Sequence, residues 1–363
     1  MVCIAAFIIL AIIALFVPIY SAIFKKDARK FWKIFKKAWY CIGKKVRLQK
    51  CETGFKDDVK NTILAKVLMK NPKLVKPIGA VIETVAVLIV VIAIWSLLTV
   101  VKSSLALYVY GTCDVASPSS CSLDASESCS IDSEHLGFFE SIGQLKLHVY
   151  IGNWFGEFGE VVAAVPARVK HWDASEYISK DANYYNKYDS GKESSLDIFD
   201  PGCIVCRQSY INQLNSGFFD KYNVAMLVYP IGAVDGGYKF KNSYIIARYI
   251  TAVRLYDLDN HDRSPDWMIV HKLFTEYDEK GRQYQDAFNF SYSADEAERV
   301  LQDWLEEFGF DSIEVDKVIE ESNSDKVKAE ISANVDVVNN NIKTKKIPTT
   351  IYNGKRHSGL FKP

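Results

Sequence analysis

Two long apolar runs dominate the first hundred residues of the chain. Val2–Phe24 carries no charged side chain, and Ile78–Val101 carries only Glu83. Each run is long enough to cross a hydrocarbon core as a helix, which takes about 20 residues. Basic residues follow the first run instead of preceding it, which favours an uncleaved anchor over a cleaved signal peptide. The pattern predicts two transmembrane helices, at residues 1–24 and 78–109.

The charges are distributed unevenly around these runs. The chain has 44 Lys and Arg and 44 Asp and Glu, but residues 25–77 alone hold 17 basic and four acidic residues. The positive-inside rule places this basic loop in the cytoplasm, partly against anionic membrane lipid. A short loop between two spans does not favour nucleic acid as a partner. We expect a two-pass protein of the cytoplasmic (plasma) membrane, with everything after about residue 102 extracytoplasmic.

The sequence changes character after the second run. Residues 110–139 are rich in Cys, Ser and Asp, and we interpret them as an extracytoplasmic linker. Residues 140–363 alternate strand and helix patterns, which predicts a soluble α/β domain. Apolar stripes and helix-capping signals predict a helical insertion over about residues 240–342. Stripes of this kind are typical of packed core and not of a binding site.

Three of the eight cysteines lie in the linker, on the side of the membrane where disulfides form. We predict a structural disulfide between Cys113 and Cys121. Cys129 is then left over, or it pairs with Cys3, which this topology also places outside. The sequence does not decide between these alternatives.

The sequence does not favour a metal site. Cys41 and Cys51 lie in the basic loop, where we expect free thiols or a weak metal pair, because nothing nearby supplies two further ligands. The six histidines are scattered, and none is paired at ligand spacing. No metal or other cofactor is expected.

The last two cysteines form a C-x-x-C motif, Cys203-Ile-Val-Cys206. Residues 195–199 have the pattern of a buried strand, and Asp-Pro-Gly at 200–202 is a turn signal. An amphipathic helix is predicted after Cys203, followed by a second strand at Val224–Tyr229. This βαβ pattern places the first cysteine at a helix N-terminus, where the macrodipole stabilises a thiolate.

A second element lies far downstream of the motif. Ile347-Pro348 precedes a β-rich run, Thr349–Tyr352, and Asn353-Gly354 is a strong hairpin signal. A proline that opens a strand beside a redox helix is a candidate for a cis peptide bond. We therefore predict a hairpin whose first strand begins at Pro348.

The two elements together resemble the thioredoxin superfamily over about residues 190–363. With the insertion, the chain is similar to the DsbA-like thiol–disulfide oxidoreductases. The resemblance implies a thioredoxin-like fold with an exposed nucleophile at Cys203, a buried resolving thiol at Cys206, and a cis-proline at Pro348 preceded by Ile347. Asp197 matches the family's buried acid, although a strand-end acid facing solvent is an equal alternative. Implied partners are extracytoplasmic protein thiols or disulfides and a membrane redox partner.

The chain departs from this family in two places. The dipeptide between the cysteines is Ile-Val, where DsbA-like oxidants usually have Pro-His. Without a histidine beside the thiolate we expect a weaker oxidant, with a less depressed Cys203 pKa. The family's usual final helix does not follow the hairpin. The aromatic stretch at 149–172 is a candidate for alternative cover or for a partner surface.

Three functions remain as alternatives at this point. The first is an enzyme that exchanges disulfides through Cys203 and Cys206. The second is a structural or interaction protein in which these two cysteines form a permanent disulfide. The third is metal binding by the C-x-x-C motif, which would need two further ligands. The direction of electron flow stays open.

Overall fold

The computed structural model describes residues 75–118, 128–132, 136–256 and 264–363, together with Trp32, Lys36, Trp39 and Tyr40. The first predicted transmembrane helix and most of the basic loop lie outside the described residues. So do Cys3, Cys41, Cys51 and Cys121. The chain divides into two compact units, Met1–Val101 and Lys102–Pro363.

Helix α4, Val75–Tyr110, contains the second predicted span. Within the described residues, one stretch is long and apolar enough to cross a membrane, Glu83–Tyr110, judged by length and composition. The helix continues past Lys102, the residue that closes the apolar run. A two-pass topology stays a prediction, because its first span is not among the described residues.

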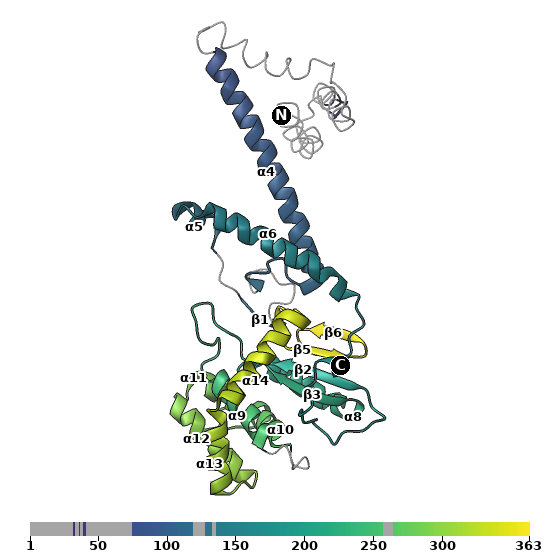
Figure 1. The fold of residues 1–363 in the computed structure, drawn as a ribbon, viewed down its shortest axis with the longest axis vertical. Coiled ribbons are helices and arrows are strands. Elements are labelled where there is room, and N and C mark those ends of the chain that lie inside the picture. The colour runs from purple at the N-terminus through teal and green to yellow at the C-terminus, as the bar shows by residue number, and fades with distance from the viewer. Residues whose placement is uncertain are drawn as a thin grey trace, which may run out of the picture. The chain divides into compact units, whose positions relative to one another are not determined.

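The second unit is built on a four-stranded sheet with the strand order β3-β2-β5-β6 (Figure 1). Strand β2, Ser194–Phe199, runs parallel to β3, Asn223–Val228. On its other side β2 pairs antiparallel with β5, Thr349–Tyr352, which forms a hairpin with β6, Lys355–Ser358. Because β2 is covered on both faces, its sequence is almost continuously buried, as expected for a central strand.

Helices connect and cover these strands. The β2–β3 connection holds α7, Ile204–Asn215, and α8, Phe218–Lys221, which completes the predicted βαβ unit. A helical insertion separates β3 from the hairpin, and Figure 1 shows most of its helices grouped on one side of the sheet. This mixed arrangement fits a thioredoxin-like fold with an insertion. The insertion consists of α9 Ser243–Tyr256, α10 Pro265–Thr275, α11 Tyr284–Phe290, α12 Ala294–Glu307, α13 Ser312–Ser322, α14 Asp325–Asp336 and the π-helical turn Val337–Ile342.

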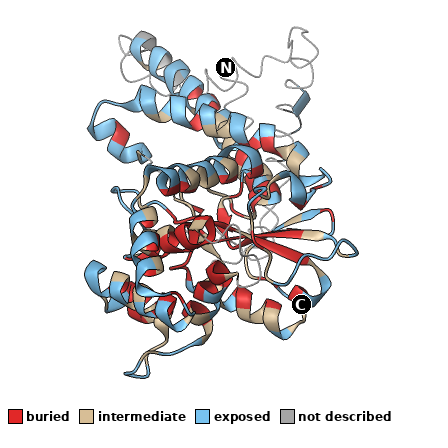
Figure 2. Cartoon of the chain, turned by 60° about the horizontal axis from the view of Figure 1, so that its bottom comes forward, coloured by how far each residue is buried: buried red, intermediate tan, exposed pale blue. Residues whose placement is uncertain are grey.

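The insertion shares one hydrophobic core with the sheet, as its apolar stripes predict (Figure 2). Helix α9 is buried over nearly its whole length, because other helices of the insertion pack around it. The predicted capping box is confirmed: Ser293 accepts from the Glu296 backbone N–H, and the Glu296 carboxylate accepts from that of Ser293. Trp304, fully buried on α12, meets the rings of Tyr284 and Phe288 edge-on.

The aromatic stretch before the sheet forms helix α6, Leu147–Ala164, preceded by the short α5, Phe138–Gly143. Its inner face packs on the last turns of α4, where Ala106, Val109, Val161 and Ala164 form a small separate core. Lys102 is buried there because Glu157 pairs with it and the Trp154 ring lies 5.2 Å from its ammonium. This stretch thus joins the end of α4 to the folded domain.

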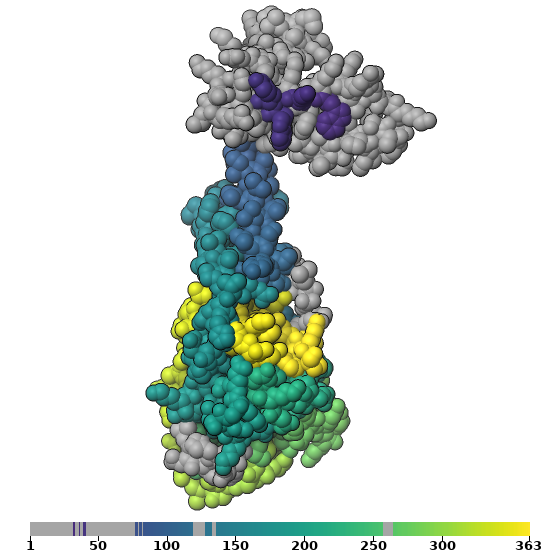
Figure 3. Space-filling view, turned by 90° about the vertical axis from the view of Figure 1, so that its right-hand side faces the viewer, coloured from purple at the N-terminus to yellow at the C-terminus, as the bar shows by residue number. Residues whose placement is uncertain are grey.

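The short helical turns Val165–Arg168 and Ala174–Glu176 flank Trp172, which covers part of the hairpin. The backbone N–H of Trp172 donates to the Gly354 carbonyl at 2.9 Å, and the ring is buried. Near the end of the chain, Phe361 packs edge-on against Phe218, with the ring centroids 4.9 Å apart. Figure 3 shows the C-terminal residues, in yellow, on the surface of one face. These two segments therefore add to the cover of the hairpin.

Candidate active site

Cys203 stands at the N-terminus of α7, as the βαβ pattern predicts. Strand β2 leads into the tight turn at 200–202, and Cys203 is the extended N-cap residue with φ −77° and ψ 116°. Its carbonyl accepts from the backbone N–H groups of Cys206 and Arg207 at 3.0 and 3.2 Å. The sulfur is therefore attached at the positive end of the helix, where a thiolate is stabilised.

A buried carboxylate holds the turn that precedes Cys203. Asp200 is fully buried and accepts from the backbone N–H of Gly202 at 2.7 Å and of Ile231 at 2.6 Å. The Ser243 hydroxyl donates to the same carboxylate. Burial raises the pKa of Asp200 to about 6, and these hydrogen bonds act in the opposite direction. Asp200 thus joins the turn to the segment that follows β3 and to the first residue of α9.

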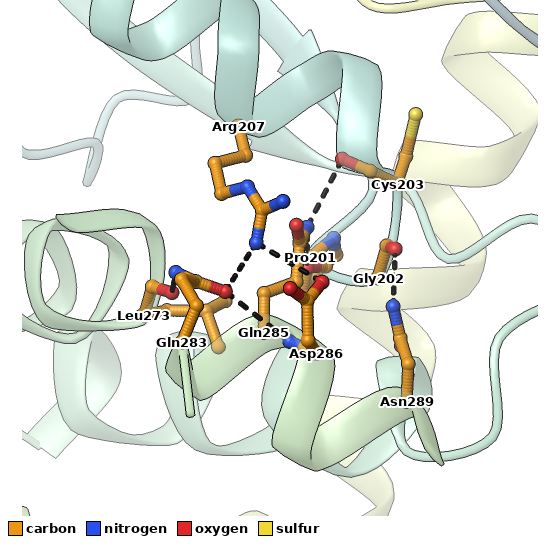
Figure 4. A network of polar contacts seen from close by, with 9 residues as sticks. All are labelled: Pro201, Gly202, Cys203, Arg207, Leu273, Gln283, Gln285, Asp286 and Asn289. Atoms are coloured by element: carbon orange, nitrogen blue, oxygen red, sulfur yellow. Dashed lines mark hydrogen bonds and ion pairs between the residues drawn. The ribbon is translucent and has the colours of Figure 1, made fainter. Parts of the chain in front are cut away.

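Two amide side chains of the insertion hold the same turn from below (Figure 4). Gln285 donates to the carbonyls of Pro201 and Cys203 at 2.7 and 3.0 Å, and Asn289 donates to that of Gly202 at 2.7 Å. Each carbonyl of residues 201–203 therefore has a side-chain donor from α11. In Figure 4 the Cys203 sulfur points away from these contacts, so the network positions the backbone and leaves the sulfur to other partners.

Glycine is required at position 202 because neighbouring side chains lie too close to leave room for a Cβ atom, and not because of its backbone angles. A Cβ atom there would lie 2.3 Å from the Phe240 Cβ and 3.0 Å from the Asn289 Oδ1. We expect Gly202→Ala to destabilise the protein by about 1–3 kcal/mol through overpacking, and to slow disulfide exchange because the Cys203 backbone must shift. Chemical unfolding of the full chain in detergent micelles checks this.

Gly156→Ala is the matched control for that substitution. Gly156 is exposed in the middle of α6, and a Cβ atom there would have no neighbour within 4 Å. The control should be as stable as the parent, or slightly more stable, because alanine favours a helix. Equal stability of the two variants would contradict the packing argument.

The second predicted element lies against the first. The Ile347–Pro348 peptide bond is cis, as predicted, and it opens strand β5. The Cys203 Sγ lies 3.9 Å from the Ile347 carbonyl oxygen, although the two residues are 144 positions apart. The structure therefore brings the C-x-x-C motif and the proline loop together, while their chemical roles stay predictions.

The disulfide at this site is not the one the motif suggests. Cys203 is bonded to Cys129, with the two Cα atoms 6.3 Å apart, and Cys206 is a free, buried thiol. Cys129, which sequence analysis leaves over or pairs with Cys3, belongs to the site. The implied exposure of Cys203 is wrong for this state, since its exposed fraction is 0%.

Cys129 reaches Cys203 on a short strand. Strand β1, Cys129–Ser130, pairs antiparallel with β4, Lys346–Ile347, so that Cys129 lies opposite Ile347. These two strands form a separate two-stranded sheet beside the main one. A peptide segment thus lies along the proline loop while its cysteine is bonded to Cys203.

Buried acids surround the free thiol. Burial raises the pKa of Cys206 well above its ordinary value, and the charges of Asp200 and Asp197 raise it further. Asp197 is 4% exposed, which excludes the alternative of an acid facing solvent. Burial raises its pKa to about 6 against the hydrogen bond from Thr350, 2.8 Å long. Cys206 is therefore protonated here, with a carboxylate near enough to influence its proton.

The predicted Cys113–Cys121 disulfide lies partly outside the described residues. Cys113 is disulfide-bonded, as predicted, but Cys121 is not described, so that pairing stays a prediction. Where the structure describes the chain, no three His, Cys, Asp or Glu side chains are placed to hold a metal ion.

Sequence reasoning missed four residues of the site. Asp200 was part of a turn signal only, and no stripe or capping signal in the sequence marked the helix that holds Gln285 and Asn289. Cys129 is in a stretch that looks like a linker. An odd number of linker cysteines was the one available signal, since it leaves a thiol in need of a partner.

The chain is similar to solved thiol–disulfide oxidoreductases of the DsbA-like kind. One is the thiol-disulfide exchange protein alpha-DsbA2 from Wolbachia pipientis: 15% identity, TM-score 0.34, covering 52% of this chain and 88% of that chain. A second is MdbA, a thiol-disulfide oxidoreductase from Corynebacterium diphtheriae: 12% identity, TM-score 0.36, with coverage of 49% and 89%. A third is the oxidoreductase NmDsbA1 from N. meningitidis: 17% identity, TM-score 0.28, with coverage of 53% and 89%.

No family model matches the sequence, and no curated protein matches it.

Proposed function

We propose that this chain is a membrane-anchored extracytoplasmic thiol–disulfide oxidoreductase that acts on protein thiols and disulfides through Cys203 and Cys206. One observation carries the proposal. Cys203, at the head of α7, is disulfide-bonded to a cysteine on a strand that pairs with β4 beside Pro348. This is the geometry that a mixed disulfide with a bound peptide requires: an extended partner, backbone hydrogen bonds and a sulfur at the helix terminus.

The proposed reaction uses Cys203, Cys206 and two thiols of the substrate. In the oxidising direction, a substrate thiolate attacks Cys203 of a Cys203–Cys206 disulfide, and Cys206 leaves as a thiolate and takes a proton. A second substrate thiolate then attacks the substrate sulfur of the mixed disulfide and releases Cys203. The substrate loses two electrons and the pair gains them. A reducing reaction runs through the same steps in reverse.

Surrounding groups have distinct parts in this proposal. The N-terminus of α7 stabilises the Cys203 thiolate as the leaving group. Asp197, buried near Cys206, accepts and returns the proton of that thiol. A separate membrane redox partner restores the pair, and α4 keeps the domain at the extracytoplasmic face of the cytoplasmic membrane. Membrane lipid is thus a further partner.

The test is to trap substrates. Because Cys129 is disulfide-bonded to Cys203, the trapping variant combines Cys129→Ser with Cys206→Ser. Cys203 then has neither of these two thiols to resolve its mixed disulfides. Produced in cells as the full chain, it should accumulate disulfide-linked adducts with other proteins, seen as reducible bands on non-reducing gels. The mixed disulfides persist because nothing attacks them from within the chain.

Two control variants make this result specific. Replacing Cys203 by Ser in the same double variant should remove every adduct. Cys41→Ser alone, in the predicted cytoplasmic loop, should behave as the parent chain. Absence of adducts in the double variant, with the protein folded and in the membrane, would refute the proposed function.

The alternative is a non-catalytic thioredoxin-fold protein with a permanent disulfide. The observation in its favour is that Cys203 is fully buried beneath Cys129. Under this alternative the Cys129–Cys203 bond is a structural disulfide that links β1 to the start of α7. It differs from the structural Cys203–Cys206 disulfide that the sequence suggests. The full chain would then keep the same disulfide in every redox buffer in which it remains folded.

A further inference from the structure

Strand β1 occupies the place that a substrate peptide would take under the proposed function. The pairing extends beyond the two residues of the strand, because the backbone N–H of Ile131 donates to the Lys345 carbonyl at 3.2 Å. Residues 129–131 therefore lie along residues 345–347 as an added strand. Main-chain pairing of this kind binds extended peptides with little dependence on their side chains.

One lysine adds side-chain recognition to this pairing. The Lys239 ammonium donates to the Ser130 carbonyl, the Ser130 hydroxyl and the Asp132 carboxylate at 3.0, 3.1 and 3.0 Å. The Ser130 hydroxyl also donates to Asp132 at 3.0 Å. Through its contacts with the two side chains, this ammonium favours a small hydroxyl residue directly after the cysteine and an acid three residues after it.

There is room beyond the cysteine for more of a peptide. Ile131 and Asp132 line a cavity of about 1060 Å³, bounded on its other sides by residues that include Tyr229, Tyr244 and Lys345. A bound chain that continues past Asp132 would have this cavity beside it.

We propose that β1 is a substrate-like peptide that belongs to the chain itself and occupies the site. Cys129 is then a third redox cysteine, which alternates with Cys206 as the disulfide partner of Cys203. This rests on the proposed function and specifies how its groove is occupied and which peptides it takes. External substrates in this class are extended segments with a cysteine, a small hydroxyl residue next to it and an acid three positions on.

The exchange balances without any external oxidant. The Cys206 thiolate attacks the Cys203 Sγ, the Cys203–Cys206 bond forms, and the Cys129–Cys203 bond breaks. Cys129 leaves as a thiolate, and the proton lost by Cys206 passes to it through Asp197 or water. Three cysteines share one disulfide before and after. One isomer has its groove filled by β1, and the other is an oxidised C-x-x-C with the groove available.

The first test maps disulfides in the wild-type full chain in detergent micelles. Acid quenching, alkylation of free thiols and mass spectrometry of the digest should find two isomers: Cys129–Cys203 with free Cys206, and Cys203–Cys206 with free Cys129. Detection of a single isomer in all redox buffers would overturn the inference. No variant is needed, so a folding defect cannot obscure the result.

The second test separates this inference from the proposed function. Cys206→Ser alone should trap at least about tenfold fewer protein adducts than Cys129→Ser with Cys206→Ser, because a tethered thiol competes at a millimolar effective concentration. Equal trapping by the two variants would overturn the inference about β1 and Cys129 and leave the oxidoreductase standing. Trapping by neither would refute the oxidoreductase, and the inference with it.

The third test measures peptide preference at Cys203 in the full-length double variant. The probes are two synthetic peptides, ESCSIDS, which is residues 127–133, and the same peptide with Asp132→Ala, each offered as its glutathione mixed disulfide. The acidic peptide should form about threefold to tenfold more covalent complex at equilibrium, the size expected for one partly exposed charge-assisted contact.

Lys239 should account for this preference. Lys239→Ala should make the two peptides equal, while Lys241→Ala, which removes the same charge from an exposed position two residues along, should keep the difference. A preference that survives Lys239→Ala, or no preference in the parent, would overturn the assigned specificity.

Discussion

Cys203→Ser should abolish thiol–disulfide exchange by the full chain. Cys203 is one of the bonded cysteines in both of the disulfide isomers that we propose, and it stands at a helix N-terminus beside the strand that carries Cys129. We expect the rate at which the reduced chain exchanges with a model disulfide peptide to fall about a thousandfold or more, to the uncatalysed rate. The measurement is fluorescence of a peptide whose two labelled ends separate when its disulfide opens.

The same substitution should also change the state of Cys129. Without Cys203, the Cys129 thiol has lost its partner, and a maleimide should label it in every molecule, whereas in the oxidised parent chain the molecules with the Cys129–Cys203 bond stay unlabelled at Cys129. Cys41→Ser serves as the control and should match the parent in exchange rate. Exchange well above background in Cys203→Ser would show that another thiol carries the reaction.

The stability of the folded domain should decrease as the pH rises from about 4 to about 6. Asp197, Asp200 and Asp266 are fully buried, and burial raises the pKa of each to about 6. Between pH 4 and 6 the folded state therefore keeps protons that the unfolded chain has released. Each carboxyl then contributes about 3 kcal/mol of stability below pH 4 that is lost by about pH 6, since one pKa unit corresponds to about 1.4 kcal/mol.

Guanidinium unfolding of the full chain in detergent micelles, followed by tryptophan fluorescence, measures this dependence. Asp197→Asn should remove about a third of it, because one of three comparable carboxyls no longer titrates. Asp220→Asn, on the exposed side of α8, should leave the slope as it is. His357 contributes in the opposite direction, since burial lowers its pKa, but it contributes equally to all three proteins. A stability that rises from pH 4 to 6 in the parent, or an unchanged slope in Asp197→Asn, would contradict the assignment.

Local signals in the sequence were enough to predict the frame of the site. The apolar run of β2 and the Asp-Pro-Gly turn depend on neighbouring residues, so they locate Cys203 at a helix start. Helix α7 itself is less amphipathic than predicted, because its buried face includes Ser209 and Gln213. Pro348 followed by a β-rich run and Asn353-Gly354 predicted the hairpin for the same reason.

The partner of Cys203 was not predictable in this way. Strand β1 has two residues, too few for any alternation to show, and it is held by β4, more than 200 positions away. Its stability comes from contacts with Lys239 and with the proline loop, which no local pattern reports. The amides of Gln285 and Asn289 were missed because sequence alone does not show which backbone carbonyls lie opposite a helix.

Those two amides connect the insertion to the turn that leads into Cys203. Three consecutive carbonyls, of Pro201, Gly202 and Cys203, take their side-chain donors from α11. A variant without residues 240–342 would remove these donors. Each carbonyl oxygen left buried without its donor would lower the stability of the fold by about 1–3 kcal/mol. The C-x-x-C segment and the helices beyond β3 therefore depend on each other structurally. Transplanting the motif alone onto another scaffold would transfer its thiols without the hydrogen bonds that orient the turn.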